Sequence, residues 1–169
     1  LHKTDAGGVK LNIHSADEAA AAYQEILANV ARTKPGARTD GVLVQEMAPA
    51  GVEMIIGVTK DKQFGPMLLV GMGGVFVEVF KDAALYPAPL NHDEAIGMLK
   101  KLKSYKLLTG YRGAKPCDID ALADMMVKIG DYACAHCDEL KELDLNPVFV
   151  YPEGEGVCAV DALIVNEID

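Results

Sequence analysis

Apolar and polar residues alternate in several short stretches of the chain. This two-residue period is typical of strands that bury one face, and glycine- or proline-containing turns separate the stretches. The pattern predicts strands over residues 9–13, 42–47, 52–60, 66–72 and 75–80, and a terminal β-hairpin with arms at 143–151 and 157–165. The tight turns between them favour an antiparallel sheet.

Other stretches follow the helical period. They predict helices from Ser15 to about residue 32, over about 92–103 and over about 118–138. Ser15 and Glu18 have the spacing of a capping box, and Asp118 is a candidate N-cap. Residues 33–41 and 105–116 are expected to be loops. The fold class predicted is α+β, mainly an antiparallel sheet backed by helices.

Composition narrows the classes of partner. The chain has 169 residues, a net charge of −9 and no run of Lys or Arg. This argues against general binding to a nucleic-acid backbone, and no segment has the roughly 18–20 apolar residues of a membrane span. We expect a cytoplasmic protein of one domain, or of two lobes, with no nucleic-acid or membrane partner. Because it begins with Leu1 rather than Met, we expect a piece of a longer protein.

The four cysteines do not demand an oxidising compartment. Cys134 and Cys137 have the spacing of a metal-binding pair, but no second close pair accompanies them. They also fall on a predicted helix. Packed thiols are therefore favoured over a zinc site.

The terminal hairpin carries polar groups on an otherwise apolar strand. The polar set on one face is Glu142, Asp144 and Asn146, and the core set on the other is Leu143, Leu145 and Val148. If Pro152 faces Val157 and one residue bulges, Asn146 comes close to Ala162 or Asp161 of the other arm. An amide oxygen and a carboxylate there suit Mg²⁺, while an ordinary hydrogen-bonded hairpin is the alternative.

Three glycine-containing stretches allow a second kind of site. Gly7-Gly8 could present backbone amides to a phosphate or form a simple turn. The strand end before Glu53 could receive a purine ring or form an ordinary β-turn. Gly73-Gly74, before a predicted strand that contains Glu78, permits close approach of a ligand or another backbone.

Together these motifs resemble one family. "HKTDAGGV", "VLVQEM", "GVEMIIGV", "QFGPMLLVGMGGVFVEVFKD", "GYRG" and "ELDLNP" followed by "AVDA" stand in the order found in the ATP-grasp part of NDP-forming acyl-CoA synthetases, such as ADP-forming acetyl-CoA synthetase. The β chain of succinyl-CoA synthetase is a more distant relative. The resemblance covers nearly the whole chain.

The resemblance implies an ATP-grasp fold that holds a nucleotide between two lobes. Residues 1–41 would be the remainder of the small lobe and 42–169 the C-terminal lobe, with a hinge near 44–48. The implied reaction converts an acid, CoA and ATP into acyl-CoA, ADP and phosphate through acyl phosphate and phosphohistidine. The implied cofactors are ATP or ADP and Mg²⁺.

Matching the motifs assigns nucleotide contacts to particular residues. Gln45 would be a hinge residue near the adenine, with the backbone of Met47 and Ala48 beside the ring. Glu53 would bind the ribose hydroxyls. Gly7-Gly8 would lie by the phosphates.

The same matching assigns the chemical groups. Asn146 and Asp161 would hold Mg²⁺, and Arg112 of "GYRG" is a candidate for anion contact. His2 resembles a histidine proposed as a second phosphate carrier, although a local hydrogen bond is the alternative. Phosphoryl transfer needs positioning and charge neutralisation above all, which suits this set.

The sequence also departs from the family. A lysine-bearing strand, the CoA-binding domain and the domain with the principal phosphohistidine are absent, and Leu163 stands where the family often has Arg. The expected partners are therefore those two domains, fused or as a separate subunit, in an oligomer. The alternative function is a non-catalytic ATP-grasp-like module of a multidomain protein acetyltransferase.

Overall fold

The computed structural model describes residues 7–74 and 82–167. The chain consists of two compact units, Leu1–Ala48 and Pro49–Asp169, each held together by contacts among its own residues. The division falls directly after the predicted hinge at 44–48, while the assignment of lobes stays a prediction. The predicted strand at 75–80, with Glu78, and the candidate His2 lie outside the described residues.

The first unit contains one long helix, α1 (Ala16–Thr33). Ser15 is its N-cap, as predicted, and the Ser15 hydroxyl accepts a hydrogen bond from the Glu18 amide at 3.2 Å. The Glu18 carboxylate accepts from the amide of His14 at 2.7 Å instead of that of Ser15, so the predicted capping box is only half formed. The predicted strand at 9–13 is wrong, because this segment has no hydrogen-bonded strand neighbour among the described residues.

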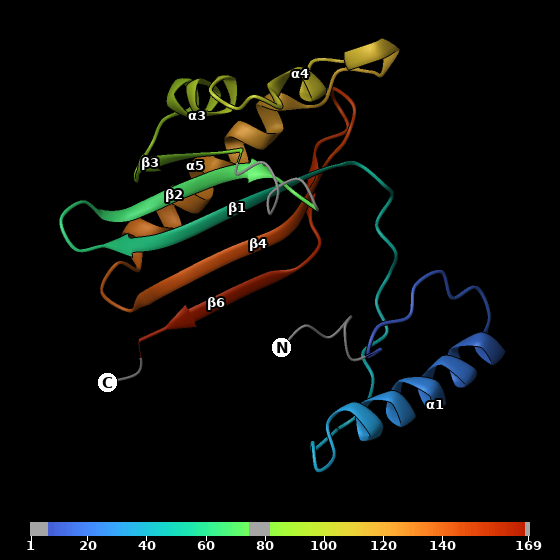
Figure 1. The fold of residues 1–169 in the computed structure, drawn as a ribbon. Helices are drawn as coiled ribbons and strands as arrows, with labels where there is room; N and C mark the ends of the chain where they lie inside the picture. Colours follow the sequence, from blue (N-terminus) through green and yellow to red (C-terminus); the bar gives the residue numbers. More distant parts are fainter. Residues whose placement is uncertain (1–6, 75–81, 168–169) are drawn as a thin grey trace. The chain divides into compact units, whose positions relative to one another are not determined.

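The second unit is built on an antiparallel sheet (Figure 1). Its strands are β1 (Val52–Asp61), β2 (Gly65–Met72), β3 (Ala83–Pro87), β4 (Leu140–Val150), β5 (Val157–Ala159) and β6 (Ala162–Asn166). The order is β3-β2-β1-β4-β5, and β6 also pairs with β4. β1 and β4 are thus the central strands. The turn after β1 is stabilised by the Asp61 carboxylate, which accepts hydrogen bonds from the amides of Gln63 and Phe64.

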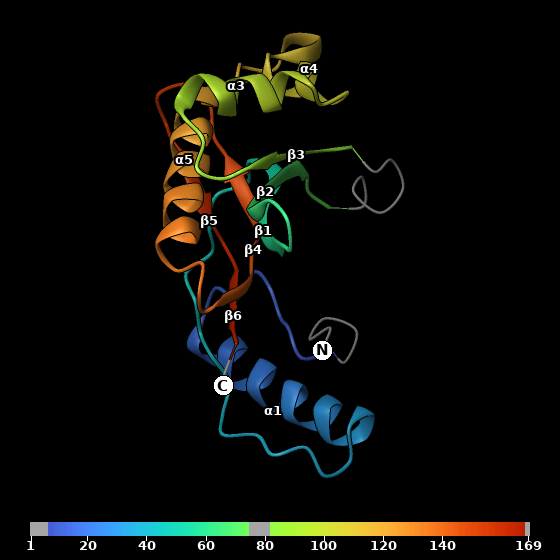
Figure 2. The ribbon, with the colours of Figure 1, turned by 90° about the vertical axis from the view of Figure 1, so that its left-hand side faces the viewer.

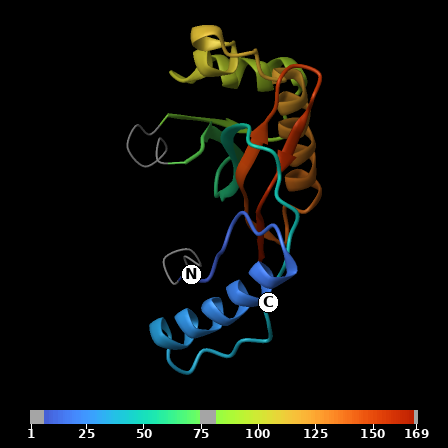
Figure 3. The same ribbon diagram turned by 90° about the vertical axis from the view of Figure 1, so that its right-hand side faces the viewer.

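Helices cover one face of this sheet. They are α3 (His92–Lys100), α4 (Tyr105–Leu108) and α5 (Ile119–Ala135), with a short 3₁₀ turn η1 at Tyr111–Gly113. Figure 2 shows α5, drawn in orange, to the left of the strands, and Figure 3, from the opposite side, shows it to the right. The helix therefore covers one face of the sheet. The largest fully buried side chains form the core on that side: Met54, Ile56, Leu68, Met98, Leu99, Leu108, Leu122, Met126, Val70, Val148 and Val150.

Two helix starts in this unit follow directly from the sequence. Asp118 caps α5 as predicted, accepting from the Ala121 amide at 3.0 Å. Asn91 and Glu94 form a complete capping box at α3. In the described part of the chain, no helix has both the length and the apolar character needed to cross a bilayer.

Several predictions for this region need correction. The predicted strand at 42–47 is not formed, and Leu43 and Val44 are about four-fifths exposed, at 79% and 83%. The predicted loop 105–116 contains α4 and η1, and β3 was missed. In the hairpin, Val157 pairs with Val150 rather than with Pro152, because Tyr151 already closes the turn onto Gly156.

Candidate functional site

Three candidate residues of the second unit, Glu53, Asn146 and Asp161, lie on the sheet face that α3 and α5 leave open. Met54 and Ile56 of β1 are buried toward the helices, so the alternation of the strand turns Glu53 and Ile55 to the other face. Glu53 is exposed and pairs across the sheet with Phe149 of β4. The part of this face that carries Glu53, Asn146 and Asp161 is called the open-face site below.

A β-bulge in β4 shapes this site. Between the pairs Ile56–Leu145 and Met54–Val148, β4 advances by one more residue than β1. The extra residue lies at Asn146–Pro147, and a bulge is one of the few places in a strand that tolerates proline. Leu145 and Val148 remain buried on the helix side, and Asn146 is exposed between them.

The structure brings Asn146 and Asp161 together across the hairpin. The Asn146 amide donates to the Asp161 carbonyl at 3.1 Å, and the Val160 amide donates to the Pro147 carbonyl at 2.9 Å. The predicted pairing of Asn146 with Asp161 is thus present in the backbone. The break between β5 and β6 falls at 160–161, opposite the bulge, and the side chains of Asn146 and Asp161 are both exposed.

The carboxylates of Glu142, Asp144 and Asp161 lie close enough for their charges to interact. Burial raises the pKa of Asp144, and the charges of Glu142 and Asp161 raise it further. Leu163, where the resembling family often has Arg, pairs directly with Asp144 and supplies no compensating charge. A region of acceptor oxygens with unfavourable mutual repulsion favours a bound cation.

Glu53 has its own close neighbours. The Gly73 amide donates to the Glu53 carbonyl at 2.7 Å. The predicted close approach at Gly73-Gly74 is therefore present, and its partner is the β1 backbone. The glycine pair was the sequence signal, but its partner could not be read from sequence spacing.

The candidate residues before Pro49 belong to the first unit. Gly7 has φ +63° and accepts a hydrogen bond from the Asn29 side chain at 3.2 Å, within the first unit. Gly8 is half-buried in a segment without regular structure. Gln45, Met47 and Ala48 lie in the irregular segment where the units divide, with Gln45 and Met47 exposed.

Arg112 occupies a left-handed conformation in η1, at φ 55° and ψ 35°. Its guanidinium carbon lies 5.3 Å from the centroid of the Tyr111 ring, within the range of a cation–π contact. The side chain is exposed, and no hydrogen bond or ion pair joins it to the open-face site among the residues described. The loop presents a cation to solvent, as an anion contact requires.

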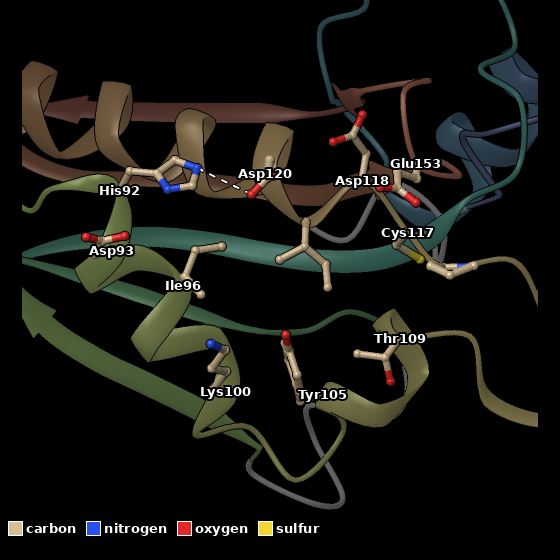
Figure 4. Close-up of a pocket in the computed structure, with 12 residues that line it drawn as sticks. His92, Asp93, Ile96, Lys100, Tyr105, Thr109, Cys117, Asp118, Asp120 and Glu153 are labelled. Atoms are coloured by element: carbon tan, nitrogen blue, oxygen red, sulfur yellow. Dashed lines mark ion pairs between the residues drawn. The ribbon is translucent and has the colours of Figure 1, made fainter.

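A separate pocket of about 450 Å³ lies between α3, α4 and the start of α5 (Figure 4). His92 and Lys100 project into it from α3, and the His92 ring nitrogen lies 3.6 Å from an Asp120 oxygen. Its full lining is His92, Asp93, Ile96, Lys100, Tyr105, Thr109, Pro116, Cys117, Asp118, Ile119, Asp120 and Glu153. None of the sequence-predicted site residues lines it. Four separate segments build it, which no motif in the sequence indicates.

The cysteines are free thiols. Burial raises the pKa of Cys117, and burial together with Cys137 and Asp131 raises that of Cys134. Within residues 7–74 and 82–167, no group of three His, Cys, Asp or Glu side chains is arranged to hold a metal ion.

Comparison with known families defines the class of protein. Residues 1–165 match the family described as "ATP-grasp domain". The chain therefore belongs to the ATP-grasp family, and the fold predicted from the resemblance is confirmed.

Within this family, the chain is similar to ADP-forming acetate–CoA ligases. It is 44% identical over 165 residues to the β subunit of acetate–CoA ligase [ADP-forming] I of Pyrococcus furiosus, covering 98% of this chain and 70% of the subunit. It is 45% identical over 168 residues to acetate–CoA ligase [ADP-forming] I of Archaeoglobus fulgidus, covering 99% of this chain but only 24% of that longer protein. These ligases show that the resemblance found in the sequence is correct.

Solved structures agree with the sequence comparison. Acetyl-coenzyme A synthetase 1 of Ca. Korarchaeum cryptofilum, in complex with coenzyme A and Ca-AMPCP, matches with a TM-score of 0.93 and 48% identity, over 99% of this chain and 72% of that one. A second structure of that protein holds Mg-AMPPCP, with a phosphohistidine segment pointing towards the nucleotide binding site, and matches with a TM-score of 0.85 and 46% identity, over 99% and 71% of the two chains. Nucleotide and metal binding are thus properties of the relatives that share this fold.

Proposed function

We propose that the chain is the nucleotide-binding part of an NDP-forming acyl-CoA synthetase. Its parent protein would convert an acid, CoA and ATP into acyl-CoA, ADP and phosphate. The supporting observation is the pairing of Asn146 with Asp161 on the open sheet face, in a chain that belongs to the ATP-grasp family. Each of the two residues contributes an oxygen of the type that Mg²⁺ prefers.

The donor set fits magnesium. Asn146 and Asp161 are adjacent and exposed. Burial, and then the charges of Glu142 and Asp161, raise the pKa of the Asp144 carboxyl beside them. A bound Mg²⁺ would supply charge neutralisation for the phosphates, which is the main requirement of phosphoryl transfer. Asn146 and Asp161 would then hold the metal.

The nucleotide would extend from this site along the start of β1. Glu53 would accept hydrogen bonds from the ribose hydroxyls, since an exposed carboxylate is an acceptor for two vicinal donors. Gln45 and the backbone of Met47 and Ala48 would contact the adenine. Gly7-Gly8 and Arg112 would contact phosphate oxygens, and His2 would carry a phosphoryl group.

Completion of the reaction would require CoA-binding and phosphohistidine-bearing parts of the same enzyme. The A. fulgidus ligase is much longer than this chain, which covers 24% of it, so a single protein of that length has room for such parts. The acyl specificity would reside in those parts, because every residue assigned above is assigned to the nucleotide, a phosphoryl group or the metal. An oligomeric, cytoplasmic parent enzyme is part of this proposal.

The test uses the intact parent protein and measures acyl-CoA and ADP formation from acetate, CoA and ATP at several Mg²⁺ concentrations. Asp161→Ala should lower kcat/KM for ATP at least about 100-fold, because loss of a metal ligand costs more than loss of an outer-shell partner. Asp131→Ala is the matched control, since Asp131 is an exposed carboxylate on α5. It should leave the rate unchanged.

Two results would separate the proposals. A folded Asp161→Ala enzyme with activity within twofold of the wild type would refute the metal role. An intact parent that binds ATP with Mg²⁺ but forms no acyl-CoA would refute the synthetase and favour the acetyltransferase-associated module.

A further inference from the structure

The end of β2 touches β1 at the residue assigned to the ribose. β2 ends at Met72, and the Gly73 amide then donates to the Glu53 carbonyl at 2.7 Å. Gly73 is buried and Gly74 is exposed. The glycine pair thus lies directly against Glu53 and shares its end of the sheet.

No side chain fits at either glycine without moving Glu53. A Cβ at position 73 would lie 2.9 Å from the Glu53 Cβ and 3.0 Å from its carbonyl carbon. A Cβ at position 74 would lie 3.1 Å from the Glu53 Oε2. The first contact constrains the Glu53 backbone and Cβ, and the second constrains its carboxylate.

The backbone of Glu53 is held on both sides. Glu53 pairs with Phe149 of β4 on one side, and its carbonyl accepts from the Gly73 amide on the other. The side chain itself is exposed, so its direction depends on what lies beside it. At Gly74 the absence of a side chain leaves room for the carboxylate.

We propose that Gly73 and Gly74 are positioning residues that aim the Glu53 carboxylate at the 2′- and 3′-hydroxyls of a nucleotide, and so set the preference for a ribonucleotide. This inference rests on the proposed role of Glu53. Gly73 sets the backbone from which the side chain starts, and Gly74 leaves the space in which the carboxylate lies. Bulk at either position would tilt the carboxylate away without removing its charge.

The test compares ATP with 2′,3′-dideoxy-ATP as substrates of the intact parent enzyme. The wild type should have a KM for ATP about tenfold lower than for the dideoxy analogue, as a hydrogen bond to a charged acceptor implies. Gly73→Ala and Gly74→Ala should raise the KM for ATP toward that of the analogue, with the KM for the analogue and kcat unchanged. An enzyme that is merely destabilised would lose activity with ATP and with the dideoxy analogue to the same extent.

Gly97→Ala is the matched control, because a Cβ there meets nothing within 4 Å. It should leave both KM values unchanged. In a Glu53→Ala background, Gly73→Ala and Gly74→Ala should have no further effect on the KM ratio, since their action passes through Glu53. If Gly73→Ala fails to fold, Gly74→Ala carries the test, because its added atom contacts only the carboxylate end. Gly74 has φ +66°, so Gly65→Ala, at φ +75° with nothing within 4 Å of the added Cβ, is its control for backbone strain.

The outcomes distinguish this inference from the proposed function. If the wild type prefers ATP and Glu53→Ala removes the preference, but both folded glycine variants keep it, positioning by the glycines is refuted. If the wild type and Glu53→Ala treat the two nucleotides alike, the ribose role of Glu53 is itself wrong and the inference falls with it. Loss of the preference in the glycine variants supports it.

Discussion

Asp118 joins two distant parts of the second unit with one carboxylate. One oxygen accepts from the Ala121 amide at 3.0 Å and caps α5. The other accepts from the amides of Gly154 and Gly156 at 3.0 and 2.9 Å, in the turn between β4 and β5. Asp118→Ala removes all three hydrogen bonds, so it should loosen the turn as well as weaken the helix start. The backbone bonds from Asp118 to Tyr151 and from Glu153 to Pro116 would remain.

The cost follows from the three bonds. Loss of the cap costs about 1 kcal/mol. Hydrogen bonds to a charged acceptor contribute about 1.5–3 kcal/mol each when buried, but Asp118 is only half-buried, and solvent screening reduces the two turn bonds to about 0.5 kcal/mol each. The free energy of unfolding should fall by about 2 kcal/mol, which lowers Tm by about 4–8 °C in a chain of this size.

The same carboxylate makes stability depend on pH. The Ala121 amide, then that of Gly156 and less strongly that of Gly154, lower the pKa of Asp118 below its ordinary 3.8, against the opposing effect of burial. A group with a lowered folded pKa stabilises the fold above its unfolded pKa, and the contribution is lost as pH falls through the folded value. The difference between wild type and variant should therefore be full at neutral pH and should shrink below about pH 3.8.

The assay is thermal unfolding followed by circular dichroism at pH 7 and pH 3. Asp118→Asn should lie between the wild type and Asp118→Ala, because its amide oxygen can keep the cap while its NH₂ group cannot accept from the turn. Asp120→Ala is the control, since Asp120 is exposed and, among the described residues, its ion-pair partner is His92, at 3.6 Å. An Asp118→Ala protein with a Tm within 1 °C of the wild type, roughly the resolution of such a comparison, would refute the reasoning.

Three further predictions concern other carboxylates. Asp82→Ala should lower the free energy of unfolding in urea by about 2 kcal/mol, because the buried Asp82 carboxylate accepts from the amides of Lys103 and Ser104 at 2.8 and 2.7 Å. Asp144→Asn should raise the free energy of unfolding at neutral pH without Mg²⁺ by up to about 1 kcal/mol. The pKa of Asp144 is raised in the folded protein, so the stability that its protonated form contributes is lost as pH rises through the folded value. Equal stability of the variant and the wild type at pH 7 would contradict this. Asp161→Ala should abolish stabilisation of the nucleotide-bound protein by Mg²⁺, measured as a shift in Tm, and a retained shift would contradict the metal assignment.

Alternation of side chains was enough to predict the central strands and their buried faces. Residues 52–60 and 66–72 became β1 and β2 within one residue at their ends. The same alternation failed at 9–13 and 42–47, because a strand also needs a hydrogen-bonded neighbour that the local sequence does not reveal. β3 at Ala83–Pro87 was missed for the converse reason, since a short stretch that ends in proline pairs with β2 through tertiary context alone.

The candidate site was predictable only in part. The pairing of Asn146 with Asp161 could be inferred because a tight turn links their strands, although the register assumed at Pro152 was wrong. The bonds from Asp118 to the turn, and the contact of Gly73 with Glu53, join residues far apart in sequence. Such contacts depend on how strands and helices pack, and no local pattern encodes them.

The two faces of the sheet divide stability from the proposed function. The helix side carries the core and the buried Asp82, and the hydrogen bond from the Ala121 amide to Asp118 anchors the start of α5. On the open face, Asn146 and Asp161 are exposed and joined through backbone atoms, and Asp144 has a pKa raised by burial and like charges. Side chains there contribute little to folding, and the ionised Asp144 opposes it. Substitutions on the open face should therefore alter nucleotide and metal binding while the fold persists, whereas substitutions at Asp82 or Asp118 should reduce stability first and activity only as a consequence.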